Sequence, residues 1–165
     1  MKKYLKPVAW TAFMAMSITI FLFSHQPAEQ SSQVSQSVLH EVLTRIVSGY
    51  AGMEREKQMT LIACYHNWIR NAAHFFLYTL WGFSLSFLLQ TYCLRRKRLV
   101  IATIGGGVLY AVLDELHQLF IEGRSAQFVD VCVDVSGVLT GLGCFLAIVY
   151  CLTRICRKLL SKKNN

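Results

Sequence analysis

Four long apolar stretches dominate this chain of 165 residues and limit the folds that are open to it. They cover residues 7–23, 72–94, 99–121 and 128–152, each close to the ~20 residues that an α-helix needs to cross a bilayer. Charged residues make up only 16% of the chain, whereas they make up about a quarter of a typical soluble domain. We therefore expect an all-α fold, an integral membrane four-helix bundle forming one domain over residues 1–165.

The basic residues predict the orientation of this bundle. Twelve of the 17 Lys and Arg residues lie in three clusters on alternate loops. The clusters comprise Lys2, Lys3 and Lys6; Arg95, Arg96, Lys97 and Arg98; and Arg154, Arg157, Lys158, Lys162 and Lys163. The nine carboxylates lie elsewhere, so the positive-inside rule places both termini in the cytoplasm of a multi-pass plasma-membrane protein. The net charge of +8 then indicates anionic membrane lipids as partners, and no nucleic acid.

The first apolar stretch also has the basic start of a signal peptide. Residues 24–28 offer no clear cleavage site between small residues, so we expect an uncleaved membrane anchor. The six cysteines include no C-x-x-C pair and indicate neither a disulfide framework nor a zinc site. We expect no cofactor.

Residues 24–69 form the only sizeable segment outside the expected spans. Apolar residues recur in it at helical spacing, namely Val34, Val38, Leu39, Val42, Leu43, Ile46 and Tyr50. Polar residues occupy the other side, and Gly49 fits a helix end. We expect an amphipathic helix in this first extracytoplasmic loop, either on the outer membrane surface or packed on the outer ends of the spans.

Ionisable residues occur inside three of the spans, where each costs roughly 2.5–3.5 kcal/mol to insert. They fall on helical stripes, which are Arg70, His74, Tyr78 and Trp81; Asp114, Glu115, His117 and Gln118; and Asp130, Asp134, Gly137 and Gly141. The three stripes reach one level in the outer half of the bundle, so we expect them to face each other rather than lipid. Gly137 and Gly141 favour close helix packing.

Such a cluster is compatible with several kinds of chemistry. A buried carboxylate beside a histidine can act as a general acid or base, and Asp114 or Glu115 with His74 are the catalytic candidates. His74, His117, Asp114 and Asp130 are also a possible mixed metal site, but no spacing is diagnostic and we expect no metal. A purely structural pairing of His74 with Asp114 is the alternative.

Arg124 lies in the short turn between the last two spans. Its guanidinium suits an anionic headgroup, a phosphate or a carboxylate. The alternatives are a rim ion pair with Glu122 or a structural pair with Asp130 or Asp134.

Several segments are distinctive in combination. Residues 21–27 read F-L-F-S-H-Q-P, and residues 70–78 read R-N-A-A-H-F-F-L-Y. Residues 114–120 read D-E-L-H-Q-L-F, followed by G-R-S at 123–125 and D-V-C-V-D at 130–134. In this order they resemble the VanZ-like family, with its R-K-x-x-H-x-x-x-Y segment and its D-E-x-x-Q-x-F…G-R…D-x-x-x-N/D-x-x-G signature.

The resemblance implies a four-helix bacterial membrane protein, in a family named after a protein linked to low-level resistance to the glycopeptide teicoplanin. No reaction is established for the family, so the resemblance supplies no mechanism. The chain departs from the pattern at Asn71, where the family usually has Lys, and Asp134 stands where Asn is common. The positions that carry over are Arg70, His74, Tyr78, Asp114, Glu115, Gln118, Arg124, Asp130, Asp134 and Gly137.

The leading hypothesis is a protein that acts at the outer leaflet on a lipid-linked cell-wall precursor or a lipoglycopeptide and gives low-level teicoplanin resistance. The expected ligand-binding residues are Arg70, Tyr78, Gln118, Arg124, Asp130 and Asp134. One alternative is a small intramembrane hydrolase or transferase that uses the same Asp/Glu/His cluster. The other is a non-catalytic accessory or scaffold subunit, and the sequence leaves the oligomeric state open.

Overall fold

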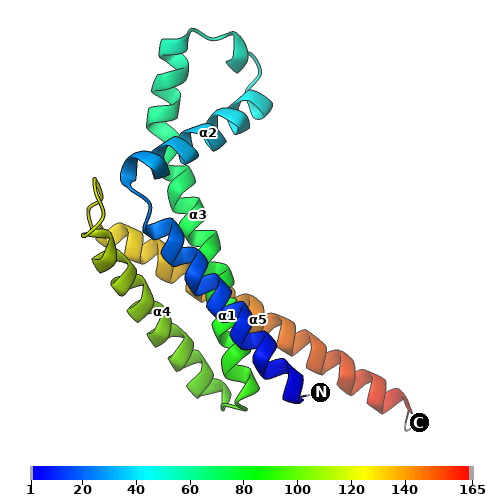
Figure 1. Cartoon of the computed structure of the whole chain (residues 1–165). Helices are drawn as coiled ribbons and strands as arrows, with labels where there is room; N and C mark the ends of the chain where they lie inside the picture. Colours follow the sequence, from blue (N-terminus) through cyan, green and yellow to red (C-terminus); the bar gives the residue numbers. More distant parts are fainter. Residues whose placement is uncertain (1, 164–165) are drawn as a thin grey trace.

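The chain is almost entirely helical in this computed structural model, which describes residues 2–163 (Figure 1). The elements are α1 (Lys2–Ser24), α2 (Ala28–Ile46), the 3₁₀ turn η1 (Tyr50–Gly52), α3 (Arg55–Thr91), α4 (Arg96–Gln118) and α5 (Phe128–Lys163). Side-chain surroundings are described for residues 5–160, so the cationic side chains of Lys2, Lys3, Lys162 and Lys163 lie outside the described set. No strand occurs between residues 2 and 163, and the predicted all-α class is confirmed.

The helices α1, α3, α4 and α5 are each long and apolar enough to cross a membrane. Their outward faces carry large exposed apolar side chains, such as Phe21 on α1, Phe76 on α3, Leu109 on α4 and Ile148 on α5. A contiguous apolar exterior of this kind is suited to lipid and not to water. The prediction of a four-helix membrane bundle is therefore confirmed.

Two helices extend beyond the apolar stretches. α3 begins at Arg55 and has 37 residues, and α5 continues to Lys163 and has 36. At 1.5 Å per residue each is roughly 55 Å long, against a hydrocarbon core of about 30 Å. Hydropathy identifies only the part of a helix that suits lipid. Residues 55–81 contain neither Pro nor Gly, so α3 begins well before its apolar stretch and continues into it without a break.

α3 and α5 form the most extensive helix pair, and they cross near the middle of the bundle (Figure 1). Glycines permit this close crossing. A Cβ atom at Gly137 would lie 2.5 Å from the carbonyl oxygen of Phe75, and one at Gly141 would overlap the carbonyl oxygen of Thr79. The two backbones are therefore in direct contact, as small residues at membrane helix interfaces allow.

α1 packs against α3, and α4 packs against α5 and α3. The buried apolar residues between them are Ile20, Tyr78, Trp81, Leu85, Ala111 and Val138. Ser17 joins α1 to this core, because its Oγ accepts a hydrogen bond from Trp81 Nε1 at 2.9 Å and its carbonyl oxygen accepts one from Tyr110 at 2.8 Å.

The expected amphipathic helix is α2, which leans against the N-terminal half of α3 (Figure 1). Ser35 and Leu39 are buried in this contact, whereas Val34, Val38 and Ile46 remain exposed. α2 thus packs on α3, and it still presents apolar surface. We call the end of the bundle beside α2, where α1 and α4 end and α5 begins, the α2 end.

Candidate polar site at the α2 end of the bundle

Two residues one turn apart on α3 pair with two residues one turn apart on α5. Arg70 Nη2 lies 3.3 Å from Asp130 Oδ2, and His74 Nδ1 lies 3.3 Å from Asp134 Oδ1. A spacing of four residues puts each pair of side chains on one helix face, so the two contacts lie one helical turn apart between α3 and α5. The second contact is more deeply buried than the first: the side chain of Asp130 is 12% exposed and that of Asp134 is 0% exposed.

Asp114 on α4 is the buried meeting point of three helices. Its Oδ2 accepts a hydrogen bond from Ser24 Oγ at the end of α1, at 2.8 Å, and another from Tyr78 OH on α3, at 3.1 Å. Sequence reasoning gave Ser24 no role. The available signal was its position in the F-L-F-S-H-Q-P segment, which carries part of the family resemblance.

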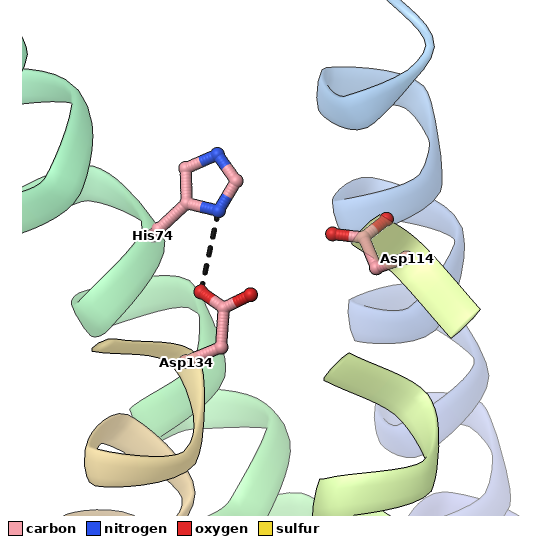
Figure 2. Close-up of side chains that lie close together, drawn as sticks. All are labelled: His74, Asp114 and Asp134. Carbon is pink, nitrogen blue, oxygen red and sulfur yellow. Dashed lines mark hydrogen bonds and ion pairs between the residues drawn. The ribbon is translucent and has the colours of Figure 1, made fainter. Parts of the chain in front are cut away.

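His74, Asp114 and Asp134 form one compact group (Figure 2). Each can offer one ligand atom, and the three atoms lie within 4.8 Å of one another. The structural pairing expected between His74 and Asp114 is not the one observed, since His74 contacts Asp134. His117 and Asp130, which the sequence analysis placed in a candidate metal site, lie outside this group of three.

His117 faces a different direction from Asp114. Its Nε2 lies 3.3 Å from Nδ1 of His25, and its ring stacks on Phe21 with ring centroids 5.0 Å apart. His117 is 60° around the helix from Asp114 at 100° per residue, and this offset brings it to His25 and Phe21 instead of to Ser24 and Tyr78. The assignment of residues to one helical face was therefore too coarse to decide whether His117 belongs to the polar site.

Arg124 joins the α4–α5 turn to the end of α1. Its Nε donates to the carbonyl oxygen of Gln26 at 3.0 Å, its Nη1 donates to Gln118 Oε1 at 3.0 Å, and its Nη2 donates to the carbonyl oxygen of Phe23 at 3.4 Å. These contacts use three of the five N–H groups of a guanidinium, so two remain for another acceptor.

No carboxylate among the described residues pairs with Arg124, so the ion pairs expected with Glu122 or with an α5 aspartate do not form. Burial lowers the pKa of Arg124 from its usual value, and the positive charge of Arg70 lowers it further. The guanidinium stays protonated because its ordinary pKa lies far above neutrality. The charge of Arg124 is thus half-buried and lacks a carboxylate partner within the described part of the chain.

Glu115 and Gln118 are buried one turn apart on α4. Glu115 Oε2 accepts a hydrogen bond from the backbone N–H of Gln127 at 2.9 Å, which holds the α4–α5 turn. Glu115 Oε1 and Gln118 Nε2 have no hydrogen-bond partner among the described residues. Glu115 lies outside the compact group, so Asp114 is the carboxylate of this helix that the structure brings to His74.

A cavity of about 310 Å³ opens beside this cluster, between α1, α2, α3 and the α4–α5 turn. Arg70, His74 and Arg124 contribute its ionisable groups, and apolar side chains such as Val34 and Leu77 form much of the remaining lining. The cavity therefore combines cationic groups with an apolar environment.

A second cavity of about 510 Å³ lies at the opposite end of α4 and α5. Its cationic lining comes from Arg96, Arg154 and Arg157, and none of the polar-site residues borders it. A basic lining of this kind is suited to contact with anionic lipid headgroups, to which basic clusters of membrane proteins are attracted. We therefore treat it as separate from the polar site.

Residues 9–150 match the sequence profile of the family described as VanZ/LLP1. The chain belongs to this family. No curated protein and no solved structure matches it. In this VanZ/LLP1 protein, the segments that carry the family resemblance in the sequence converge at the α2 end, where they build the polar site and line the cavity.

Proposed function

We propose that this VanZ/LLP1 protein lies in the plasma membrane and binds the anionic headgroup of an amphiphile at the outer leaflet. The observation that carries the proposal is the cavity at the α2 end, where Arg70, His74 and Arg124 border an otherwise largely apolar space. A lipid-linked cell-wall precursor or a lipoglycopeptide offers both an anionic group and a long apolar chain. Low-level resistance to teicoplanin would follow from binding of either compound.

The two arginines supply the attraction for the headgroup. Arg124 keeps two N–H groups free and has no carboxylate partner among the described residues. Guanidinium groups bind phosphate and carboxylate through paired N–H groups, and such charge-assisted hydrogen bonds are roughly twice as strong as neutral ones. Low polarity around the cavity strengthens the interaction further.

The apolar part of the amphiphile has two adjoining surfaces. Phe76 borders the cavity and is 64% exposed on the face of α3 that suits lipid. Farther along the α2–α3 contact, an apolar groove of about 560 Å³ is lined by residues that include Leu39, Leu43 and Trp68. Both surfaces are suited to an acyl or prenyl chain.

The proposed orientation places the α2 end outside the cell and both termini in the cytoplasm, in accord with the distribution of basic residues. Two exposed native cysteines test it, since Cys64 lies near the α2 end on α3 and Cys156 lies near the other end of α5. In intact cells that express single-cysteine variants of the protein, a membrane-impermeant maleimide should label Cys64 and leave Cys156 unlabelled. The reverse pattern would invert the orientation and remove the outer leaflet from the proposal.

Binding is tested on the full chain in lipid nanodiscs with a lipid-linked cell-wall precursor and with teicoplanin as separate probes. Arg124→Gln should weaken binding of the recognised probe about 10-fold or more, as expected for a lost hydrogen bond to a charged group. The matched control is Arg154→Gln, which removes a cation from the cavity at the opposite end. Equal affinity of the Arg124→Gln variant and the wild type would refute the headgroup site.

An intramembrane hydrolase or transferase is a second candidate function. The observation that favours it is the contact of a hydroxyl, Ser24, with the carboxylate of Asp114, beside the imidazole of His74. Turnover of a bound lipid substrate by purified protein, abolished in Asp114→Asn, would support catalysis. If the Asp114→Asn variant loses only membrane abundance or thermal stability, the cluster has the structural role of a scaffold.

A further inference from the structure

Three helices each contribute one potential metal ligand to the centre of the polar site (Figure 2). His74 comes from α3, Asp114 from α4 and Asp134 from α5. Imidazole nitrogen and carboxylate oxygen are ordinary ligands of zinc and of neighbouring first-row transition metals. Ionisable residues in a buried group do not by themselves make a metal site, so further observations are needed.

The second observation is an unpartnered oxygen inside the group. Asp134 is fully buried, and its Oδ2 has no hydrogen-bond partner among the described residues. Figure 2 shows one carboxylate oxygen of Asp134 facing His74 and the other turned toward the side on which Asp114 lies. A buried carboxylate oxygen without a donor is costly, and a cation in the space between these three side chains would satisfy it.

The separations within the group also suit one ion. The distance from His74 Nδ1 to Asp134 Oδ1 is 3.3 Å, which is long for a hydrogen bond. Two ligand atoms on a tetrahedral ion, at metal–ligand distances of about 2.0–2.1 Å, lie about 3.3 Å apart. The three side chains offer ligand atoms within 4.8 Å of one another, so they would move closer together around a bound ion.

The contacts of Asp114 resemble the support that metal ligands receive. Ser24 and Tyr78 both donate to Oδ2 of Asp114, and they fix the orientation of the carboxylate. Outer hydrogen-bond partners of this kind commonly orient metal-bound carboxylates. Oδ1 of Asp114 accepts no hydrogen bond from the described residues, so it is available to an ion.

Charge supports the same assignment. A bound metal requires ionised carboxylates and a neutral imidazole, and in that form the group carries two negative charges that a divalent cation would balance. We propose that His74, Asp114 and Asp134 bind one divalent transition-metal ion, and zinc, which accepts both imidazole nitrogen and carboxylate oxygen, is the ion used to test the site. Three protein ligands leave a fourth position, and His74 also borders the cavity of the proposed headgroup site. The metal site does not depend on which amphiphile binds there.

The test is the metal content of the full chain, purified in detergent through a tag without histidines. After dialysis against Zn²⁺ and removal of free ion, the wild type should retain about one equivalent per chain. Asp134→Asn should weaken binding by at least about 10-fold, because it replaces a ligand of the ion. The matched control is Asp130→Asn, one turn earlier on α5, which removes the partner of Arg70 and leaves the three ligands in place.

A second control addresses the exposed histidine pair. His117→Ala should leave the bound Zn²⁺ unchanged, since His117 contacts His25 outside the group. Loss of zinc in His117→Ala would overturn the proposal in favour of the histidine pair. Wild-type content below about 0.1 equivalent, or equal content in Asp134→Asn and Asp130→Asn, would also overturn it.

If Asp134→Asn fails to fold, titration of the wild type with Co²⁺ decides the question. A visible absorption band that saturates near one equivalent, is displaced by Zn²⁺ and persists in His117→Ala would support the site. The absence of such a band would contradict it. Neither readout involves lipid or teicoplanin, so failure of the metal site and failure of the proposed function are distinguishable.

Discussion

Replacement of Gly141 by Ala should separate the two central helices. The added Cβ would overlap the carbonyl oxygen of Thr79 and lie 2.7 Å from the backbone nitrogen of Phe83. Both are backbone atoms of α3 and cannot rotate away. Restoring 3.4 Å at the second contact alone requires a shift of at least about 0.7 Å, and a gap of this size forfeits a quarter to a half of each dispersion contact it opens.

Overpacking of this kind typically costs about 1–3 kcal/mol. Gly143→Ala is the matched control, because Gly143 lies on the same helix as Gly141 and a Cβ atom there would meet nothing within 4 Å. Both variants gain the same helix propensity of about 1 kcal/mol, so the difference between them isolates the packing cost. We expect Gly141→Ala to be less stable than Gly143→Ala by about 1–3 kcal/mol in reversible unfolding in mixed micelles. Equal stability of the two variants would refute the close α3–α5 crossing.

Three further experiments probe the polar site. Ser24→Ala removes a donor to Asp114 and should lower the free energy of unfolding by about 1–3 kcal/mol in the same assay; an unchanged value would show that the hydrogen bond contributes nothing. Arg70→Ala and Asp130→Ala should be non-additive in a double-mutant cycle, with a coupling energy of about 0.5–3 kcal/mol, whereas additive effects would mean that the pair does not interact. Arg124→Lys retains the charge but loses the planar fork, so headgroup binding should fall less than in Arg124→Gln, and equal losses would contradict a role for the charge.

The architecture was predictable because its determinants are local. Apolar runs of about 20 residues identify membrane helices, and helical spacing in residues 34–50 identified α2. The ends of α3 and α5 were less accessible, since α3 before residue 72 and α5 after residue 152 mix polar and apolar side chains, and hydropathy alone does not detect such helix extensions. Most of the ionisable residues on the three stripes have side chains that meet at one end of the bundle.

The pairings within the site were not predictable from the stripes alone. The contact of His74 with Asp134, and not with Asp114, depends on the relative height of α3 and α5, which the backbone contacts at the glycines set. A helical wheel defines a face but no partner helix. The same limit explains why Ser24 was missed and why His117 was grouped with residues that it does not contact.

A structure of the full chain in nanodiscs with a lipid-linked cell-wall precursor tests the central claim most directly. Our account predicts that the anionic headgroup lies within hydrogen-bond distance of Arg124 and beside Arg70, with its chain against Phe76 or along the α2–α3 contact. A precursor bound only at the opposite end, beside Arg96 and Arg154, would contradict the account.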